Sequence, residues 1–148
     1  MPRVVATIAV PEPIFNAEQL WYDTDRWAAF VDGFNHVVKV EGDWPREGTL
    51  IWDSHPGGRG RVIEQVRWFS PREGQDADVE DPKLTGTQRV RFAPGRVTLE
   101  LEYRLKESMW LVDLFFIRGQ LRQSLRRTLR RFAIELDAER ELLRPADG

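Results

Sequence analysis

The chain has 148 residues, with 22 lysines and arginines against 24 aspartates and glutamates, and it contains no cysteine. This length is typical of one compact domain, so we expect a single domain over residues 1–148. The formal net charge of −2 argues against a nucleic-acid partner, which requires an excess of basic charge. Without cysteine, and with two histidines, the chain lacks the usual material for a disulfide framework or a zinc site. Neither a metal nor another cofactor is expected.

A short β-branched run opens the chain over residues 4–10 and is followed by Pro11 and Glu12. It is shorter than most signal-peptide cores and lacks a cleavage site of the usual kind, so we interpret it as a strand. No stretch reaches the ~20 apolar residues that a bilayer-spanning helix needs. We therefore expect no integral membrane segment, and a soluble, cytoplasmic protein.

Two short helices are predicted after this strand. Pro11 and Pro13 suit the start of a helix, which residues 14–22 continue. Thr24 is the expected N-cap of a second helix over residues 25–30, and the pair Asp32-Gly33 would end it.

Between Phe34 and Leu105 apolar and polar residues alternate, which is the period of β-strands. Strands are predicted over residues 34–41, 49–55, 61–69, 85–92 and 97–105, and the acidic segment 75–81 is a candidate short edge strand. A four-residue turn at 93–96 would join the last two strands and pair Phe92 with Val97. The same register places Arg89 opposite Glu100 on a solvated face.

The last third of the chain is predicted to be one helix, from an N-cap at Ser108 to about Leu143, and about 50 Å long. Its apolar residues recur every three or four positions: Trp110, Leu114, Ile117, Leu121, Leu125, Leu129, Phe132 and Leu136. A curved antiparallel sheet can cover such a stripe and give an α+β protein of two layers. Gly119, in mid-helix, costs ~1 kcal/mol relative to alanine and marks a candidate bend.

This order of elements resembles the helix-grip fold of the SRPBCC superfamily, also called START-like or Bet v-like. Several segments are similar to bacterial members described as polyketide cyclase/dehydrase: residues 10–15 (VPEPIF), 25–30 (DRWAAF), 58–66 (GRGRVIEQV), 84–88 (LTGTQ) and 114–118 (LFFIR). The resemblance implies a curved antiparallel β-sheet wrapped around a long C-terminal α-helix, with two short helices after the first strand. It also implies a cavity for an apolar molecule, in which some members of the superfamily catalyse a reaction.

The more apolar face of each strand is expected to line this cavity, together with the apolar side of the long helix. The candidate ligand-binding residues are Trp52, Val66, Trp68, Gln88, Val90, Phe92, Leu101, Tyr103, Leu114, Ile117, Arg118 and Leu121. Core packing is the default interpretation for most of the six tryptophans. Trp44, in a loop beside Pro45, is instead a candidate either for a gate at the cavity opening or for contact with a membrane surface.

Four polar side chains are candidates for catalysis: His36, Glu64, Tyr103 and Arg118. A neutral imidazole or phenol in a dry pocket can polarise a carbonyl group, and burial would raise the pKa of Glu64 and suit it to act as a base. Arg118 lies on the apolar side of the helix, where it could hold a carboxylate or an enolate. The alternatives are hydrogen-bonded core roles for His36 and Tyr103, and an Arg118 that reaches solvent or pairs with Glu64. A one-residue shift of strand 61–69 would move Glu64 into solvent.

Two charged or glycine-rich segments invite functional interpretations. Residues 111–131 hold six arginines and one acid, a local charge of +5, and we favour a solvated helix face with i,i+4 ion pairs over an anionic-lipid docking patch. The segment Gly57–Gly60 is interpreted as a hairpin turn and not as a phosphate loop, because it leads into a strand.

The leading hypothesis is a protein that binds a small hydrophobic ligand of lipid, polyketide or aromatic type in this internal cavity. Its opening would be lined by the loops near Trp44, Gly57 and Pro82. One alternative is an enzyme, a polyketide cyclase, dehydratase or aromatase that uses the same cavity. The second alternative is a ligand-free protein that acts through its surface, with a homodimer as one form.

Overall fold

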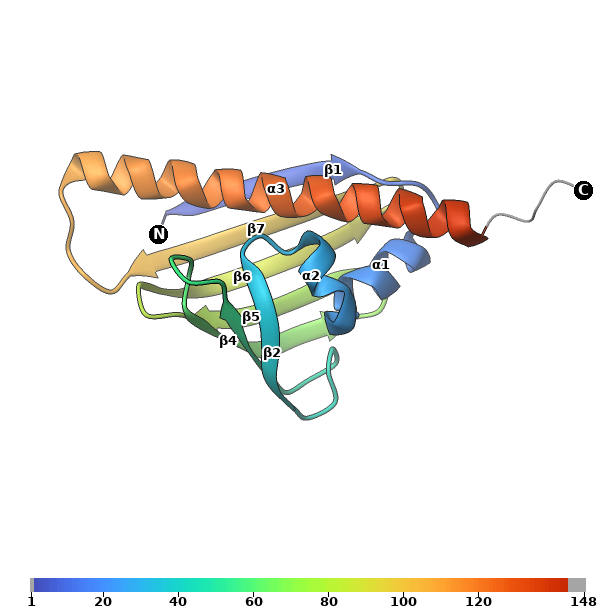
Figure 1. The fold of residues 1–148 in the computed structure, drawn as a ribbon, viewed down its shortest axis with the longest axis horizontal. Coiled ribbons are helices and arrows are strands. Elements are labelled where there is room, and N and C mark those ends of the chain that lie inside the picture. Colours follow the sequence, from blue (N-terminus) through green and yellow to red (C-terminus); the bar gives the residue numbers. More distant parts are fainter. Residues whose placement is uncertain (1, 144–148) are drawn as a thin grey trace, which may run out of the picture.

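A long helix lies across one face of a curved, seven-stranded antiparallel sheet in the computed structural model, which describes residues 2–143 (Figure 1). In chain order the elements are β1 (Arg3–Ala9), α1 (Ile14–Tyr22), the 3-10 helix η1 (Thr24–Arg26), α2 (Trp27–Phe30), β2 (Phe34–Glu41), β3 (Thr49–Ser54), β4 (Arg61–Ser70), β5 (Gly74–Glu80), β6 (Leu84–Ala93), β7 (Arg96–Leu105) and α3 (Leu111–Leu143). The predicted α+β helix-grip architecture is confirmed. The cap of η1 differs from the prediction, because the side chain of Asp23, not Thr24, accepts the N–H of Asp25.

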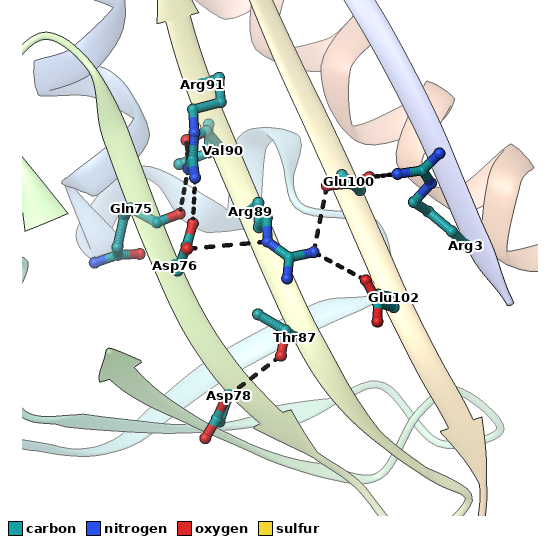
Figure 2. Close-up of polar contacts among 10 residues, drawn as sticks. All are labelled: Arg3, Gln75, Asp76, Asp78, Thr87, Arg89, Val90, Arg91, Glu100 and Glu102. Atoms are coloured by element: carbon teal, nitrogen blue, oxygen red, sulfur yellow. Dashed lines mark hydrogen bonds and ion pairs between the residues drawn. The ribbon is translucent and has the colours of Figure 1, made fainter. Parts of the chain in front are cut away.

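The strand order is β1-β7-β6-β5-β4-β3-β2, so β5 lies at the centre of the sheet and the expectation of an edge strand is wrong. Its acidic residues alternate with buried ones: Gln75, Ala77 and Val79 face the interior. Asp76 and Asp78 face away from α3, where arginines of the neighbouring strands neutralise them. Figure 2 shows the part of this network around Asp76, which Arg91 reaches at 2.7 Å. A central strand can therefore carry acids, provided that both neighbours supply the counter-charge.

The hairpin between β6 and β7 has the predicted register, with Phe92 opposite Val97 and Arg89 opposite Glu100. The Arg89 guanidinium lies 3.4 Å from Glu100 and 3.3 Å from Glu102 on the face away from α3 (Figure 2). β1 pairs with the far edge of β7, and α3 runs along this pair of strands (Figure 1).

Register shifts decide which side chains of β2 and β4 point inward. β2 has irregularities between Phe34 and His36 and between Val37 and Lys39, and β4 has one between Val66 and Trp68. An extra residue in one strand exchanges the faces of the residues that follow it. His36 and Trp68 therefore point away from the interior, contrary to expectation, whereas Phe69 turns inward.

Aromatic side chains fill the interior where α1 and α2 meet the second half of α3. Phe132 of α3 packs edge-on against Trp21 and Phe30, with ring centroids 5.5 Å and 5.2 Å apart. The cluster continues through Tyr22, Trp27, Phe34, Trp52 and Phe92. Trp44 caps this end, because its indole N–H donates to the carbonyl oxygen of Tyr22 at 3.1 Å. This part of the interior is a packed aromatic core.

The two halves of α3 have different surroundings. In the second half Leu125, Leu129, Phe132 and Leu136 are buried, as their spacing predicts. Trp110, just before the helix, is 84% exposed, and Phe116 in the first half is 65% exposed, so the expectation that the sheet covers the whole stripe is wrong there. A helix of 33 residues is about 50 Å long, whereas strands of ten residues span about 33 Å. The start of α3 consequently extends past the ends of β1 and β7 (Figure 1).

Asp32, in the turn between α2 and β2, holds the middle of α3 in place. Its carboxylate accepts hydrogen bonds from Ser124 at 2.8 Å and from Arg127 at 3.1 Å, and Arg131 also reaches it. Its backbone N–H donates to Thr128 Oγ1 at 2.9 Å. Partial burial acts to raise the pKa of Asp32, but the hydrogen bonds from Arg127 and Ser124 outweigh it and lower that pKa. The tether marks the boundary between the packed and the overhanging half of α3.

Candidate functional site

Two cavities lie on either side of the first half of α3. The first, which we call the loop-side cavity, has a volume of about 440 Å³. Its walls come from the β3–β4 loop, the β5–β6 loop, the end of β7 and α3, with the residues Gly57, Gly58, Arg59, Asp81, Lys83, Leu84, Leu105, Met109, Ile117, Gln120, Leu121, Gln123, Ser124 and Arg127. The second, the β7-side cavity, has a volume of about 480 Å³ and includes Tyr103, Leu114, Phe115 and Arg118. Leu105 and Met109 border both cavities.

A buried ion pair stands at the loop-side cavity. Arg59 Nε lies 2.9 Å from Asp81 Oδ2, and the Asp81 side chain is 2% exposed. The other oxygen of Asp81 accepts the backbone N–H groups of Lys83 at 2.8 Å and Leu84 at 3.0 Å, so the carboxylate is fixed by its own turn. Arg59 Nη2 is buried and has no hydrogen-bond partner among residues 2–143. A buried donor without a partner is costly, and a ligand acceptor would satisfy it.

Behind this ion pair lies a second buried polar contact. The Arg59 guanidinium sits 5.8 Å from the centre of the Trp52 ring, and Trp52 Nε1 donates to Glu64 Oε2 at 2.6 Å. Burial raises the pKa of Glu64, against the opposing effects of the Trp52 hydrogen bond and the Arg59 charge. The chain of contacts Asp81–Arg59–Trp52–Glu64 thus links the cavity wall to a carboxyl group inside the protein.

The register places Glu64 on the inner face of β4, which resolves the alternative left open by the sequence. Residues opposite one another across the sheet form the row Leu50, Glu64, Val79, Gly86 and Tyr103. Gly86 is required here, because a Cβ at this position would lie 2.1 Å from the carbonyl oxygen of Glu102. The row ends at the β7-side cavity, which Tyr103 lines.

Two of the four candidate catalytic residues, Tyr103 and Arg118, line the β7-side cavity. Tyr103 is buried, and burial raises its pKa, while the positive charges of Arg118 and Arg122 act to lower it. Arg118 is exposed, and among the ion pairs of the described chain none joins it to Glu64. His36 lies away from this site, with its side chain 58% exposed and Nε2 3.7 Å from Asp53 Oδ2.

The predicted ligand-binding residues divide between several places. Ile117 and Leu121 line the loop-side cavity, whereas Leu114 and Arg118 line the β7-side cavity. Trp52, Val90, Phe92, Leu101 and Tyr103 are buried on the inner side, and Val66 and Gln88 are partly buried in the inner row that ends at Leu101.

Two of the expectations about the cavity are wrong. Trp68 is on the outer face and stacks with Arg91, whose guanidinium lies 4.6 Å from the ring centre. The loops around Gly57 and Pro82 border the loop-side cavity, but Trp44 belongs to the aromatic core at the other end.

Arg59 and Asp81 are the residues that the sequence analysis missed. Arg59 stands in a glycine-rich segment whose spacing indicates a turn, and Asp81 precedes Pro82 in another turn. They are 22 positions apart, and no local pattern indicates that their loops converge.

Together, the sheet, the long helix and the open cavities beneath its first half define a helix-grip protein with space for a small molecule at one end. Within residues 2–143 we find no group of three or more His, Asp or Glu side chains arranged to hold a metal ion. No helix of that range is long and apolar enough to cross a bilayer.

Comparison with solved structures gives the same fold. No known family model and no curated protein matches the sequence. TTHA0849 from Thermus thermophilus superposes with a TM-score of 0.77 at 16% identity, over 93% of this chain and 99% of that one. A START superfamily protein from Mycobacterium smegmatis gives 0.68 at 13% identity, over 92% and 97% of the two chains.

The di-domain ARO/CYC protein BexL, from the BE-7585A biosynthetic pathway, gives a TM-score of 0.70 at 15% identity, over 89% of this chain and 48% of that one. At such identities the likeness establishes the fold. The START-like resemblance inferred from the sequence is confirmed at this level.

Proposed function

We propose that the protein binds a small, mainly apolar molecule that carries a hydrogen-bond acceptor, in the loop-side cavity. The observation that carries the proposal is the buried, unpartnered Nη2 of Arg59, a residue that lines a cavity whose other walls include Leu84, Leu105, Ile117 and Leu121. A volume of about 440 Å³ falls in the range of small-molecule sites, which combine apolar walls with few polar groups.

The charge balance of the cavity favours a neutral acceptor. Asp81 already neutralises Arg59 through their 2.9 Å contact, so a second carboxylate would bring excess negative charge to a buried place. A carbonyl or phenolic oxygen would accept from Nη2 without that cost. This chemistry is that of a polyketide or aromatic ketone more than that of a fatty acid.

The test is a titration of the protein with a hydroxyanthraquinone, a long-chain fatty acid and a sterol, followed by tryptophan fluorescence. We expect the hydroxyanthraquinone to bind best. Arg59→Gln should weaken its binding about tenfold, because a hydrogen bond from a charged donor contributes about 1.5–3 kcal/mol. Arg61→Gln is the matched control, since Arg61 is exposed and pairs with Asp53 outside the cavity.

A second pair of variants separates the cavity from the hydrogen bond. Leu121→Trp places a large side chain in the loop-side cavity and should abolish binding, whereas Ile134→Trp, on an exposed part of the same helix, should leave it unchanged. Undiminished binding to Leu121→Trp would refute the proposed site.

Enzymatic activity is the second candidate function, and Glu64 is the observation that favours it. A buried carboxyl group with a raised pKa keeps its proton to a higher pH than an exposed one, which suits it to act as a general acid. In an enzyme, Glu64→Gln should remove turnover of a bound polyketide and preserve its binding, because the amide oxygen still accepts from Trp52. In a carrier, the same variant should change affinity alone.

A further inference from the structure

The first half of α3 and the residue before it expose a cluster of large apolar side chains. Trp110, Leu111, Val112, Phe115 and Phe116, which we call the apolar tip, are each between 65% and 84% exposed. At 100° per residue, Val112 and Phe116 lie about 130° and 170° from the middle of the stripe formed by Leu125, Leu129 and Phe132, whereas Phe115 lies about 70° from it. The sheet therefore cannot cover Val112 and Phe116 by any small movement of the helix, and these side chains are available to another surface.

Arginines without counter-charges follow the apolar tip along the same helix. Of the six arginines between residues 111 and 131, Arg127 and Arg131 pair with Asp32. The other four, Arg118, Arg122, Arg126 and Arg130, make no ion pair within the described part of the chain. The expected i,i+4 pairing is thus missing, because none of these four arginines has an acid three or four positions away, and Glu135, four positions after Arg131, binds Arg26. This stretch of helix presents uncompensated positive charge to its surroundings.

A shallow hollow connects the apolar and the cationic parts of this face. It is bordered by Phe115 and Phe116 at one end and by Arg122 and Arg126 at the other, with a volume of about 420 Å³. Gly119 creates it, since nothing lies within 4 Å of the position where its side chain would start. An anionic group in this hollow would be held between two guanidinium groups and two aromatic rings.

We propose that this face of α3 docks on an anionic lipid bilayer, with the apolar tip in the interfacial region and Arg122, Arg126 and Arg130 on lipid phosphates, while Arg118 lines the β7-side cavity. Exposed aromatic residues beside arginines match a bilayer surface, where apolar groups meet negative headgroups. Docking would also bring the openings of both cavities close to the lipid, because Met109 borders both and Phe115 borders the β7-side cavity. The proposal goes beyond ligand binding, since the face can dock whether or not the cavity is occupied.

A second copy of the chain fits this face less well. Two apolar tips packed symmetrically would bring the free arginines of both copies together, and the face itself contributes Asp113 as its one acid between residues 111 and 131. An anionic bilayer removes the apolar surface from water and neutralises the arginines at the same time.

The experiment is vesicle flotation with the full chain, using phosphatidylcholine vesicles with and without phosphatidylglycerol. We expect binding to the phosphatidylglycerol vesicles that weakens as salt is added, and little binding to phosphatidylcholine alone. The double variant Trp110→Ser/Phe116→Ser should weaken binding by about tenfold or more, through lost apolar burial. Arg126→Gln and Arg130→Gln should each weaken it by about fivefold.

Matched controls carry the same chemical changes elsewhere. Ile134→Ser removes a side chain that is as exposed as Phe116, and Arg96→Gln removes an exposed charge from the β6–β7 turn. Both should bind like the unsubstituted protein, and all variants should keep its far-ultraviolet circular dichroism.

Three results would overturn the proposal. They are failure to float with phosphatidylglycerol vesicles, equal binding to both vesicle types, and binding that the tip variant does not change. Sedimentation velocity distinguishes the competing occupant: a dimer that Trp110→Ser/Phe116→Ser dissociates, without vesicle binding, would make this face a homodimer interface and the proposal wrong.

Discussion

The first and second halves of α3 carry similar heptad-like apolar spacing and reach opposite outcomes. In the second half Leu129 and Phe132 are buried among Trp21, Phe30 and the sheet. In the first half Ile117 and Leu121 are partly buried beside open cavities, and the residues before them face solvent. The difference arises from what lies beneath the helix, since α1 and α2 supply large side chains under the second half, and among residues 2–143 no helix does so under the first.

This contrast teaches that a single helix can combine a packed half and an overhanging half. The packed half and its Asp32 tether hold the helix on the sheet, so the overhanging half can keep an open space below it and an apolar surface above it. Binding sites are commonly built in this way, on an element that a rigid scaffold positions.

The largest expected effect on stability comes from a substitution in the packed half of α3. Phe132→Ala should lower the free energy of unfolding by about 3–5 kcal/mol, because it leaves a cavity among Trp21 and Phe30. Phe116→Ala, in the exposed half, should change it by no more than about 0.5 kcal/mol. Urea unfolding of both variants measures the difference. Equal losses would mean that the first half of α3 packs against the protein after all.

The second prediction concerns the pH dependence of stability that the buried carboxyl group of Glu64 causes. Because the pKa of Glu64 is raised in the folded protein, the folded state holds this proton more tightly than the unfolded chain. Its stabilising contribution is present below the usual pKa of 4.5 and is lost as pH rises through the raised value. Each unit of difference contributes about 1.4 kcal/mol.

Glu64→Gln should therefore be more stable than the unsubstituted protein above this range, and the gap should close as pH falls below 4.5. Urea unfolding across a pH series measures it, and Glu47→Gln, at an exposed carboxylate of the β2–β3 loop, is the control. A constant gap at every pH would show that proton binding by Glu64 does not contribute.

The smallest expected effect on stability comes from a substitution in the overhanging half of α3. Gly119→Ala should raise the free energy of unfolding by about 0.5–1 kcal/mol, because alanine favours the helix and nothing surrounds the new methyl group. Gly86→Ala should instead destabilise the protein, since its Cβ would meet the Glu102 carbonyl oxygen at 2.1 Å. Thermal unfolding distinguishes the two, and a loss for Gly119→Ala would indicate that the hollow is needed for folding.

Much of the fold was predictable because its signals are local. Alternation places β6 and β7, and the four-residue turn between them sets the register of the hairpin through Phe92 and Val97. α1 was predicted over its full observed range, from Ile14 to Tyr22, since the prolines before it mark its start. These features depend on residues that are neighbours in the chain.

The site was less predictable, because it depends on residues that are distant in the chain. Glu64 faces inward as its alternation suggests, but the irregularity after Val66 moves Trp68 to the other face of the same strand. The irregularities in β2 do the same to His36. A bulge costs little free energy and has no clear sequence signature. A prediction from strict alternation therefore assigns every residue beyond the bulge to the wrong face of the sheet.

By itself the sequence determined the order of the elements, the long apolar helix and the START-like resemblance, since propensity, periodicity and turn chemistry act over short distances. The tertiary structure decided which half of that helix is covered, which strand is central and that Arg59 meets Asp81 beside an open cavity. These outcomes depend on how far the sheet reaches under a helix that is longer than its strands, and on where separate loops converge. Residues that are neighbours in the chain give no signal of either outcome.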